Sequence, residues 1–137
     1  MIYVLDSNIV IHYLRGNEKA RHMYSEAVLQ GHLLIIPRAV HYEVSRGLDI
    51  SAATRKFMIY NEMISPRPIG QCRVADMGEQ VWGIAKDIYI ELKQKGFTVG
   101  EIDILIAAFC LQHDYTLVTA NTKDFANVCG LRVVNWV

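Results

Sequence analysis

The sequence predicts an α/β fold in which a short parallel sheet is flanked by helices on both faces. Short, almost wholly apolar segments such as IYVLD and HLLII have the composition of strands buried in a parallel sheet. Segments with helical periodicity separate the strands. With 137 residues, of which 52% are hydrophobic and 20% charged, the chain can form a substantial core. We expect residues 1–137 to form a single domain.

Each expected element follows from local sequence signals. The predicted strands are residues 2–6, 32–36, 116–120 and 132–136. The predicted helices are residues 9–16, 18–30, 37 to about 48, 51 to about 64, 75–95 and 101–113. Ser7 or Asn8 is expected to cap the first helix, Pro37 to lie in the first turn of the third and Ser51 to cap the fourth. The prolines of segment 66–70 favour an extended conformation.

Composition excludes several classes of protein. The 14 basic residues balance the 14 acidic ones, which argues against broad electrostatic binding of nucleic acid and leaves room only for a local basic surface. The three cysteines form no metal-binding or disulfide pattern, and we expect free thiols, two of them in the core. The N-terminal segment lacks the basic start of a signal peptide, and no apolar run approaches the ~18 residues of a membrane span. We therefore expect a cytoplasmic protein.

Acidic residues occur where the sequence is otherwise apolar. Asp6 ends the first predicted strand. Glu43 lies in the row Val40, Glu43, Val44 and Gly47, and Asp103 shares a row with Ile106, Ala107 and Cys110. An unpaired charge on a buried helix face costs several kcal/mol, roughly 3–5 when its partner is missing. These acids therefore need a compensating partner or a function.

Two further polar residues, Asn121 and Asp124, follow the predicted strand 116–120. Taken singly, each polar residue has an ordinary explanation: a helix cap for Asp6, a surface position for Glu43, the helix dipole for Asp103 and a turn for the last two. Jointly they bring oxygen ligands from four segments to one edge of a parallel sheet, where ligands bind in such folds. Converging carboxylates repel each other, and a hard divalent cation such as Mg²⁺ or Mn²⁺ relieves that repulsion.

Four motifs occur in order along the chain. They are LDSN around Asp6, YEVSRG around Glu43, GEIDILIAA around Asp103, and TLVTANTKDF followed by GLRVVNW. The set resembles the PIN-domain ribonucleases, and most closely the VapC-type toxins of prokaryotic toxin–antitoxin modules. The resemblance covers essentially the whole chain and implies a PIN-like three-layer sandwich. Many relatives have an aspartate at the position of Asn121, which leaves open whether Asn121 or Asp124 completes the site.

The resemblance implies a metal-dependent endoribonuclease, the toxin of a type II toxin–antitoxin module. Asp6 and Asp103 would bind Mg²⁺, with Mn²⁺ able to substitute, and Glu43 would bind it through water or act as a base. The ion would polarise a phosphoryl oxygen and activate the attacking water. Ser7 or Asn8 would orient Asp6. The implied partners are an RNA substrate, a cognate antitoxin that occludes the site, and a second copy of the chain in a homodimer.

Three cations lie near the acidic segments in the sequence and are candidate contacts to the RNA backbone: Arg38, Arg46 and Lys123. Two alternatives remain open at this stage. One is a metal-dependent phosphohydrolase that uses the same acids on a small substrate. The other is a non-catalytic PIN-like module that binds RNA or protein, although the presence of all three acids argues against it.

Overall fold

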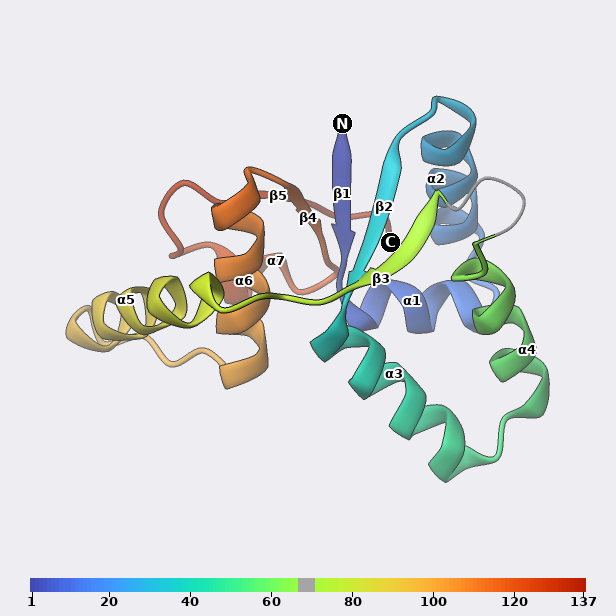
Figure 1. The fold of residues 1–137 in the computed structure, drawn as a ribbon, viewed down its shortest axis with the longest axis horizontal. Helices are drawn as coiled ribbons and strands as arrows, with labels where there is room; N and C mark the ends of the chain where they lie inside the picture. The colour runs from blue at the N-terminus through green and yellow to red at the C-terminus, as the bar shows by residue number, and fades with distance from the viewer. Residues whose placement is uncertain (67–70) are drawn as a thin grey trace.

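The sheet has five strands in the order β3-β2-β1-β4-β5, and every neighbouring pair is parallel (Figure 1). The structure is a computed structural model that describes residues 1–66 and 71–137. The strands are β1 (Ile2–Leu5), β2 (Leu33–Pro37), β3 (Cys72–Ala75), β4 (Thr116–Val118) and β5 (Arg132–Val134). The helices are α1 (Ser7–Leu14), α2 (Glu18–Leu29), α3 (Arg38–Ser51), α4 (Thr54–Met63), α5 (Gln80–Gln94), α6 (Glu101–His113) and α7 (Thr122–Phe125). The predicted fold class is confirmed.

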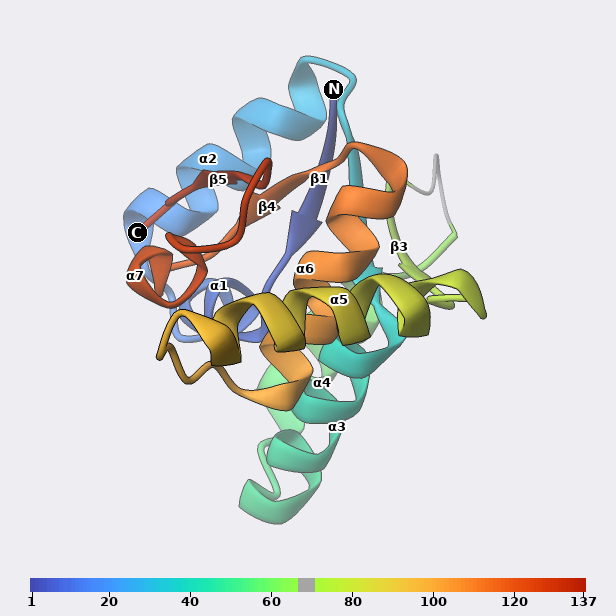
Figure 2. The ribbon, with the colours of Figure 1, turned by 90° about the vertical axis from the view of Figure 1, so that its left-hand side faces the viewer.

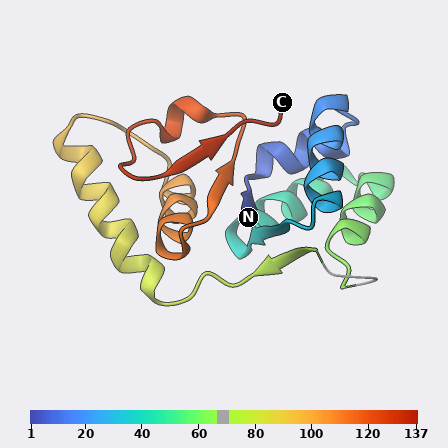
Figure 3. The same cartoon turned by 90° about the horizontal axis from the view of Figure 1, so that it is seen from above.

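Helices cover both faces of this sheet. From β1 the chain adds β2 and then β3 on one side of the sheet. It then crosses back through α5 and α6 and adds β4 and β5 on the other side of β1. Because parallel crossovers are right-handed, this reversal puts α1 to α4 on one face and α5 to α7 on the other. Figure 2 shows α5 and α6 in front of the sheet with α2 behind it, and Figure 3 shows α5 and α2 at opposite sides of the molecule. The strand order reverses between β1 and β4.

Helix α6 is the most deeply buried helix of the fold. Ile106, Ala107, Ala108 and Cys110 have no exposed surface, so α6 is apolar around its circumference, as expected of a helix enclosed on all sides. It packs against α5, α3 and β4. The carboxyl group of Asp103, in the first turn of α6, is therefore attached to one of the most rigidly held elements of the protein.

The strand β3 was not predicted, and the predicted helix 75–95 starts too early. Ala75 belongs to β3, and α5 begins only at Gln80. Gly78 adopts φ +80° in the connecting segment, a conformation that a helix does not contain. The strand is short and lies at the edge of the sheet, so only Cys72 is fully buried and the apolar signal is weak. The predicted extended piece 66–70 falls mainly on residues 67–70, which lie outside the described residues.

Three predicted helix starts are also wrong. Pro37, expected in the first turn of the third helix, is the last residue of β2 and the N-cap of α3, which begins at Arg38. Asp6, rather than Ser7 or Asn8, is the N-cap of α1. Ser51 does not cap α4, because α3 continues through it and the Ser51 hydroxyl donates to the carbonyl of Gly47. The helix α3 ends when Ala52 enters the left-handed region at φ 49°. A serine hydroxyl can satisfy helix carbonyls as well as cap a start, so its position alone did not distinguish the two.

Two smaller expectations concern the cysteines and the predicted turn after β4. Cys72 and Cys110 are buried and Cys129 is exposed, and all three are free thiols. The turn contains the short helix α7. Across the described ranges 1–66 and 71–137, no helix combines the length and apolarity needed to cross a membrane.

Candidate functional site

Asp6 lies at the carboxyl edge of the sheet, where the strand order reverses. It follows β1, which is paired with β2 on one side and β4 on the other. Its backbone N–H donates to the carbonyl of Val118, at 3.0 Å, so the parallel ladder with β4 continues up to the acid. In open parallel sheets, the helices on either side of such a reversal leave a crevice in which ligands bind. Only 2% of Asp6 is exposed to solvent.

Three hydrogen bonds hold the Asp6 carboxylate in one orientation. The Ser7 N–H donates to Oδ1 at 2.8 Å, while the Asn8 amide and the Thr119 hydroxyl donate to Oδ2 at 3.1 and 2.8 Å. A carboxylate has about four acceptor positions, so these bonds leave one of them, on Oδ1. A metal ion would therefore be bound by Asp6 through Oδ1. Of the two residues expected to orient Asp6, Ser7 is bonded to it through its backbone N–H and Asn8 through its side-chain amide.

Thr119 is a site residue that the sequence analysis missed. It is fully buried directly after β4, and its hydroxyl accepts from the Asn8 amide and from the Asn121 N–H, each at 3.1 Å, while donating to Asp6. The one donor and both acceptor positions of the hydroxyl are thus occupied. Asn8 closes the network by accepting from the Ala120 N–H at 2.8 Å. The available signal was a threonine in the TLVT segment, whose hydroxyl has to find a partner when buried.

The Asp103 carboxyl belongs to the same cluster of acids. Its pKa is raised to about 6, chiefly by burial and then by the charges of Asp6, Asp124 and Glu43, in that order. Because three other carboxylates act on Asp103, the four acids share one electrostatic environment. They come from the end of β1 and from α3, α6 and α7. A divalent cation among them would remove both the repulsion and the cost of burial.

The pKa values of the other two predicted acids are raised as well. Burial raises the pKa of Asp6 and Asp124 adds repulsion, while the bonds from Thr119, Ser7 and Asn8 oppose the rise. Burial also raises the pKa of Glu43, and the nearby charge of Asp6 adds to it, whereas a hydrogen bond from Ser7 lowers it. Ser7 therefore links both acids, contacting Asp6 through its N–H and Glu43 through its side chain.

The two alternatives for a fourth ligand occupy different positions. Asn121 is the N-cap of α7, and its N–H is bonded to Thr119. Asp124 lies in the first turn of α7, one turn later, and its charge acts on both Asp6 and Asp103. The structure brings the carboxylate of Asp124 into the electrostatic environment of the cluster.

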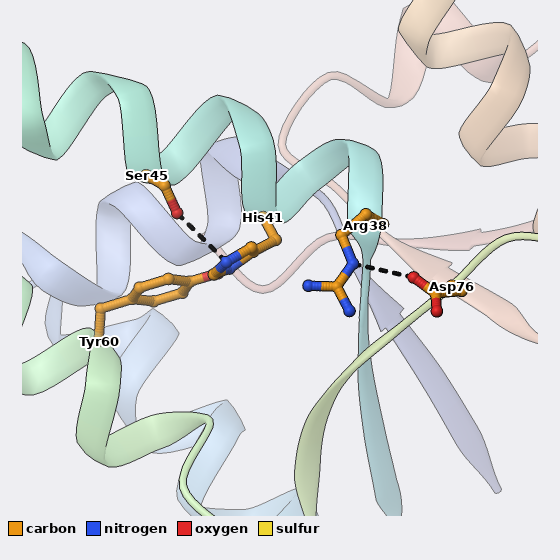
Figure 4. Close-up of polar contacts among 5 residues, drawn as sticks. All are labelled: Arg38, His41, Ser45, Tyr60 and Asp76. Atoms are coloured by element: carbon orange, nitrogen blue, oxygen red, sulfur yellow. Dashed lines mark hydrogen bonds and ion pairs between the residues drawn. The ribbon is translucent and has the colours of Figure 1, made fainter.

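The three predicted basic contacts are not grouped together. Arg38, at the start of α3, pairs with Asp76 at 2.9 Å, and Figure 4 shows this pair beside the side chains of His41 and Tyr60. Arg46 stacks on the ring of Tyr42, with its guanidinium carbon 4.9 Å from the ring centre. Lys123 is exposed on α7. Of the three, Arg46 also exerts an electrostatic effect on Glu43, whose pKa it lowers.

The donor set of the cluster fits a hard divalent cation. All the charged groups are carboxylates, and each of Asp6, Glu43 and Asp103 has a pKa raised by burial and by the other acids. Among the described residues, no three acidic, histidine or cysteine side chains are close enough to form a preassembled metal site. Binding would therefore draw the carboxylates together. All-oxygen ligation is characteristic of Mg²⁺ and Mn²⁺.

Comparison with known proteins gives a consistent assignment. A family model described as PIN domain matches residues 3–131. Ribonuclease VapC2 of Rickettsia felis is 26% identical over 136 residues, which cover 99% of this chain and 98% of the relative. The tRNA(fMet)-specific endonuclease VapC of Salmonella typhimurium is 25% identical over 134 residues, covering 98% of this chain and 97% of that protein.

A solved structure shares the fold over the full length. The crystal structure of VapBC2 from Rickettsia felis, bound to a DNA fragment from their promoter, contains a chain that superimposes with a TM-score of 0.83 at 24% identity, covering 100% of both chains. This likeness agrees with the three-layer arrangement described above.

Replacing Thr119 with valine should disturb Asp6 without changing side-chain shape. The variant removes one donor to Asp6 and leaves the Asn121 N–H and one of the two N–H groups of the Asn8 amide without an acceptor, while the other still donates to Asp6. We expect Thr119→Val to lose about 1–3 kcal/mol of stability. Mn²⁺ affinity, measured by calorimetry, should fall roughly 10–100-fold, as for other groups that orient metal ligands. Thr119→Ser retains the hydroxyl and should bind like the wild type, and unchanged affinity in Thr119→Val would contradict the role of Thr119.

The raised pKa of Asp103 makes a prediction about stability without metal. An acid whose pKa rises on folding destabilises the folded state once it ionises, so stability should fall as the pH rises from about 4 toward 6 and then level off. Asp103→Asn removes this loss and should be about 1 kcal/mol more stable than the wild type near pH 7, after allowing for solvent screening. Urea denaturation in the presence of a chelator measures the difference. The exposed Asp87→Asn serves as a control, and an Asp103→Asn protein of lower stability at neutral pH would contradict the prediction.

Proposed function

The chain belongs to the PIN domain family, and from that premise we propose that it is a divalent-metal-dependent endoribonuclease acting as the toxin of a type II toxin–antitoxin module. The observation that carries the proposal is that four carboxylates lie within electrostatic range of one another near the edge where the strand order reverses. The names of the relatives, Ribonuclease VapC2 and tRNA(fMet)-specific endonuclease VapC, support RNA as the substrate class.

The proposed roles of the acids follow from their surroundings. Asp6 is held by its three hydrogen bonds and presents Oδ1, and Asp103 is attached to the enclosed helix α6. Both would hold Mg²⁺, with Mn²⁺ as a substitute, which would supply polarisation of a phosphoryl oxygen and a more acidic bound water. Glu43 has its pKa raised by burial and by Asp6, which suits a group that accepts a proton from the attacking water or holds the ion through water.

We infer that Asp124 completes the acidic set. Its charge acts on Asp6 and Asp103, whereas Asn121 contributes a backbone hydrogen bond to Thr119. A carboxylate also attracts a divalent ion more strongly than a neutral amide does. Asn121 would then keep the start of α7, and with it Asp124, in place.

A partner protein would neutralise the toxin by occluding this site. An acidic cluster with little other compensation invites a basic side chain, and an arginine fork can pair with two carboxylate oxygens. The relatives' solved assembly is a VapBC complex, which supports a cognate antitoxin as that partner. The cytoplasm, where RNA is available, is the proposed compartment.

A second copy of the chain is the proposed partner of helix α5. Trp82 and Tyr89 lie one above the other at i and i+7, and 64% and 43% of their surfaces are exposed. Together with Lys86 and Glu101 they line a groove between α5 and α6. A twofold axis through this face would cover the aromatic rings and let Lys86 of each copy meet Glu101 of the other.

A small-molecule phosphohydrolase is the main rival. It would use the same acids, and its substrate would need an enclosed pocket beside them. Five grooves in the described part of the chain lie against α1, α3, α4 or α5, and none of these five is lined by Asp6, Glu43 or Asp103. Asp6 is buried, whereas Glu43 and Asp103 are partly exposed, so a polymer could approach the cluster from the edge of the sheet.

Metal-dependent cleavage of RNA tests the proposed function. The wild type should cleave tRNA or other structured RNA in Mg²⁺ or Mn²⁺ and lose this activity with a chelator. Asp6→Asn and Asp103→Asn should each reduce the rate by at least about 10²–10³-fold while remaining folded, because each removes a charged ligand. Products should carry 5′-phosphate and 3′-hydroxyl ends, since no histidine pair is available to activate a ribose hydroxyl. Cyclic 2′,3′-phosphate ends, or near-normal cleavage by folded Asp103→Asn, would overturn the mechanism.

Charge placed on helix α5 tests the proposed dimer. Trp82→Glu introduces a buried, unpaired charge into the twofold interface and should convert a dimer into a monomer in sedimentation velocity experiments. Leu29→Glu alters another large apolar side chain, 80% exposed on α2, and should leave the dimer intact. A dimer that survives Trp82→Glu would mean that another surface joins the two copies.

A further inference from the structure

A groove between helices α1, α2 and α4 contains a concentration of positive charge. Four of the eight residues that line it are cationic, and none is acidic. These are Arg15, Arg21, Arg55 and Lys56. They come from three separate helical segments, and the protein as a whole has no formal net charge. The tertiary fold therefore brings these cations together, and their proximity does not result from a generally basic surface.

The charges in this groove are available to a ligand. Within residues 1–66 and 71–137, the structure gives no ion pair or hydrogen bond to the side chains of Arg15, Arg55 and Lys56. Arg21 uses only Nε, which donates to the Tyr13 carbonyl at 2.9 Å, and its guanidinium lies over the Tyr13 ring. Arg21 is thus held in place while its two terminal nitrogens remain available, and like charges kept together in this way favour an anionic ligand.

Helix α1 connects the groove to the acidic cluster. Asp6 caps the N-terminal end of α1, and Arg15 caps its C-terminal end. Ser7, Ile11 and Arg15 follow one row of this helix at i, i+4 and i+8, about 12 Å in total at the rise of an α-helix. Ser7 contacts Asp6 and Glu43, and Ile11 is exposed. A short single-stranded segment laid along this row would reach from the carboxylates to the basic groove.

We infer that the groove lined by Arg15, Arg21, Arg55 and Lys56 binds the phosphate backbone of the RNA substrate, to one side of the bond that is cleaved. The inference rests on the proposed function. It adds the path of the RNA backbone, which would run from the acidic cluster along α1 to the basic groove. Arginine forks match phosphate oxygens in pairs, and a groove with four cations can hold successive phosphates without reading the bases. The acidic cluster itself repels the RNA backbone, so binding needs a cationic surface close by.

Neutralising two of the cations tests this binding directly. Arg55→Gln/Lys56→Gln changes two positions in the first turn of α4 without introducing a poor helix former. Binding of labelled single-stranded RNA would be followed by fluorescence anisotropy at several salt concentrations, in the Asp103→Asn background so that the RNA is not cleaved. Each lost phosphate contact lowers the salt slope by about 0.7, so the double variant should lose about 1.4 from the slope and bind about tenfold more weakly near 0.15 M salt.

A matched control removes the same charge elsewhere. Arg73→Gln/Lys93→Gln neutralises two exposed cations on β3 and α5 and should leave both the affinity and the slope unchanged. An equal loss in both double variants would mean that only net charge matters, and an unchanged slope in Arg55→Gln/Lys56→Gln would overturn the inference. It would also be overturned if this variant bound RNA normally but escaped neutralisation by the antitoxin, because the groove would then bind an acidic protein.

Failure of the inference can be told apart from failure of the proposed function. Wild-type hydrolysis of a small phosphodiester in Mn²⁺ reports on the acidic cluster alone, and hydrolysis of RNA is measured beside it. If the wild type cleaves RNA but the salt slope of Arg55→Gln/Lys56→Gln is unchanged, the proposed function is retained and the inference about the groove is wrong. If RNA binding depends on Arg55 and Lys56 but neither substrate is cleaved with metal, the groove binds RNA and the proposed nuclease activity is wrong.

Discussion

The hydrogen bond from the buried Thr119 hydroxyl to Asp6 is the contact on which the site depends. It joins residues that are 113 positions apart and ties the end of β4 to the end of β1. The same hydroxyl accepts from Asn8 and from the Asn121 N–H, so the start of α1 and the start of α7 are set by one oxygen atom. Asp6 is thereby oriented before any ligand arrives, which is the condition for a defined metal position.

Electrostatic repulsion limits how far such a site can be optimised. Burial and three neighbouring acids raise the pKa of Asp103 to about 6, so without a cation the folded protein keeps an ionised cluster at a cost in stability. The apolar surface of α6 provides the compensation, because its buried side chains pack against α5, α3 and β4. A strongly packed helix that carries a poorly tolerated charge is a common arrangement at functional sites. The proposed RNA-binding groove at the other end of α1 would attract the substrate that the acids repel.

Positions relative to strand ends and apolar rows were sufficient to predict the fold class and to select Asp6, Glu43 and Asp103 as candidates. Thr119 was missed because, within an apolar strand, a threonine differs little from valine in the pattern. The strand β3 was missed because an edge strand of four residues with one fully buried side chain has almost no periodic signal. The basic groove could not be predicted either, since its cations come from segments that only the tertiary fold brings together. The cations nearest the acids in sequence, such as Arg38, were instead found paired or scattered.

The parallel pairing of β1 with β4 also determines how early the site can assemble while the chain is being synthesised. Tyr3 pairs with Thr116, and no local contact replaces that pairing. At elongation rates of about 5–20 residues per second, the partner of β1 emerges roughly 6–23 s after β1 itself. Until then Asp6 has neither its Thr119 donor nor the backbone bond to Val118, and α6 has no β4 to pack against. A nascent chain therefore carries its first acid for most of its synthesis without an assembled site, and the site forms only when nearly the whole chain has been made.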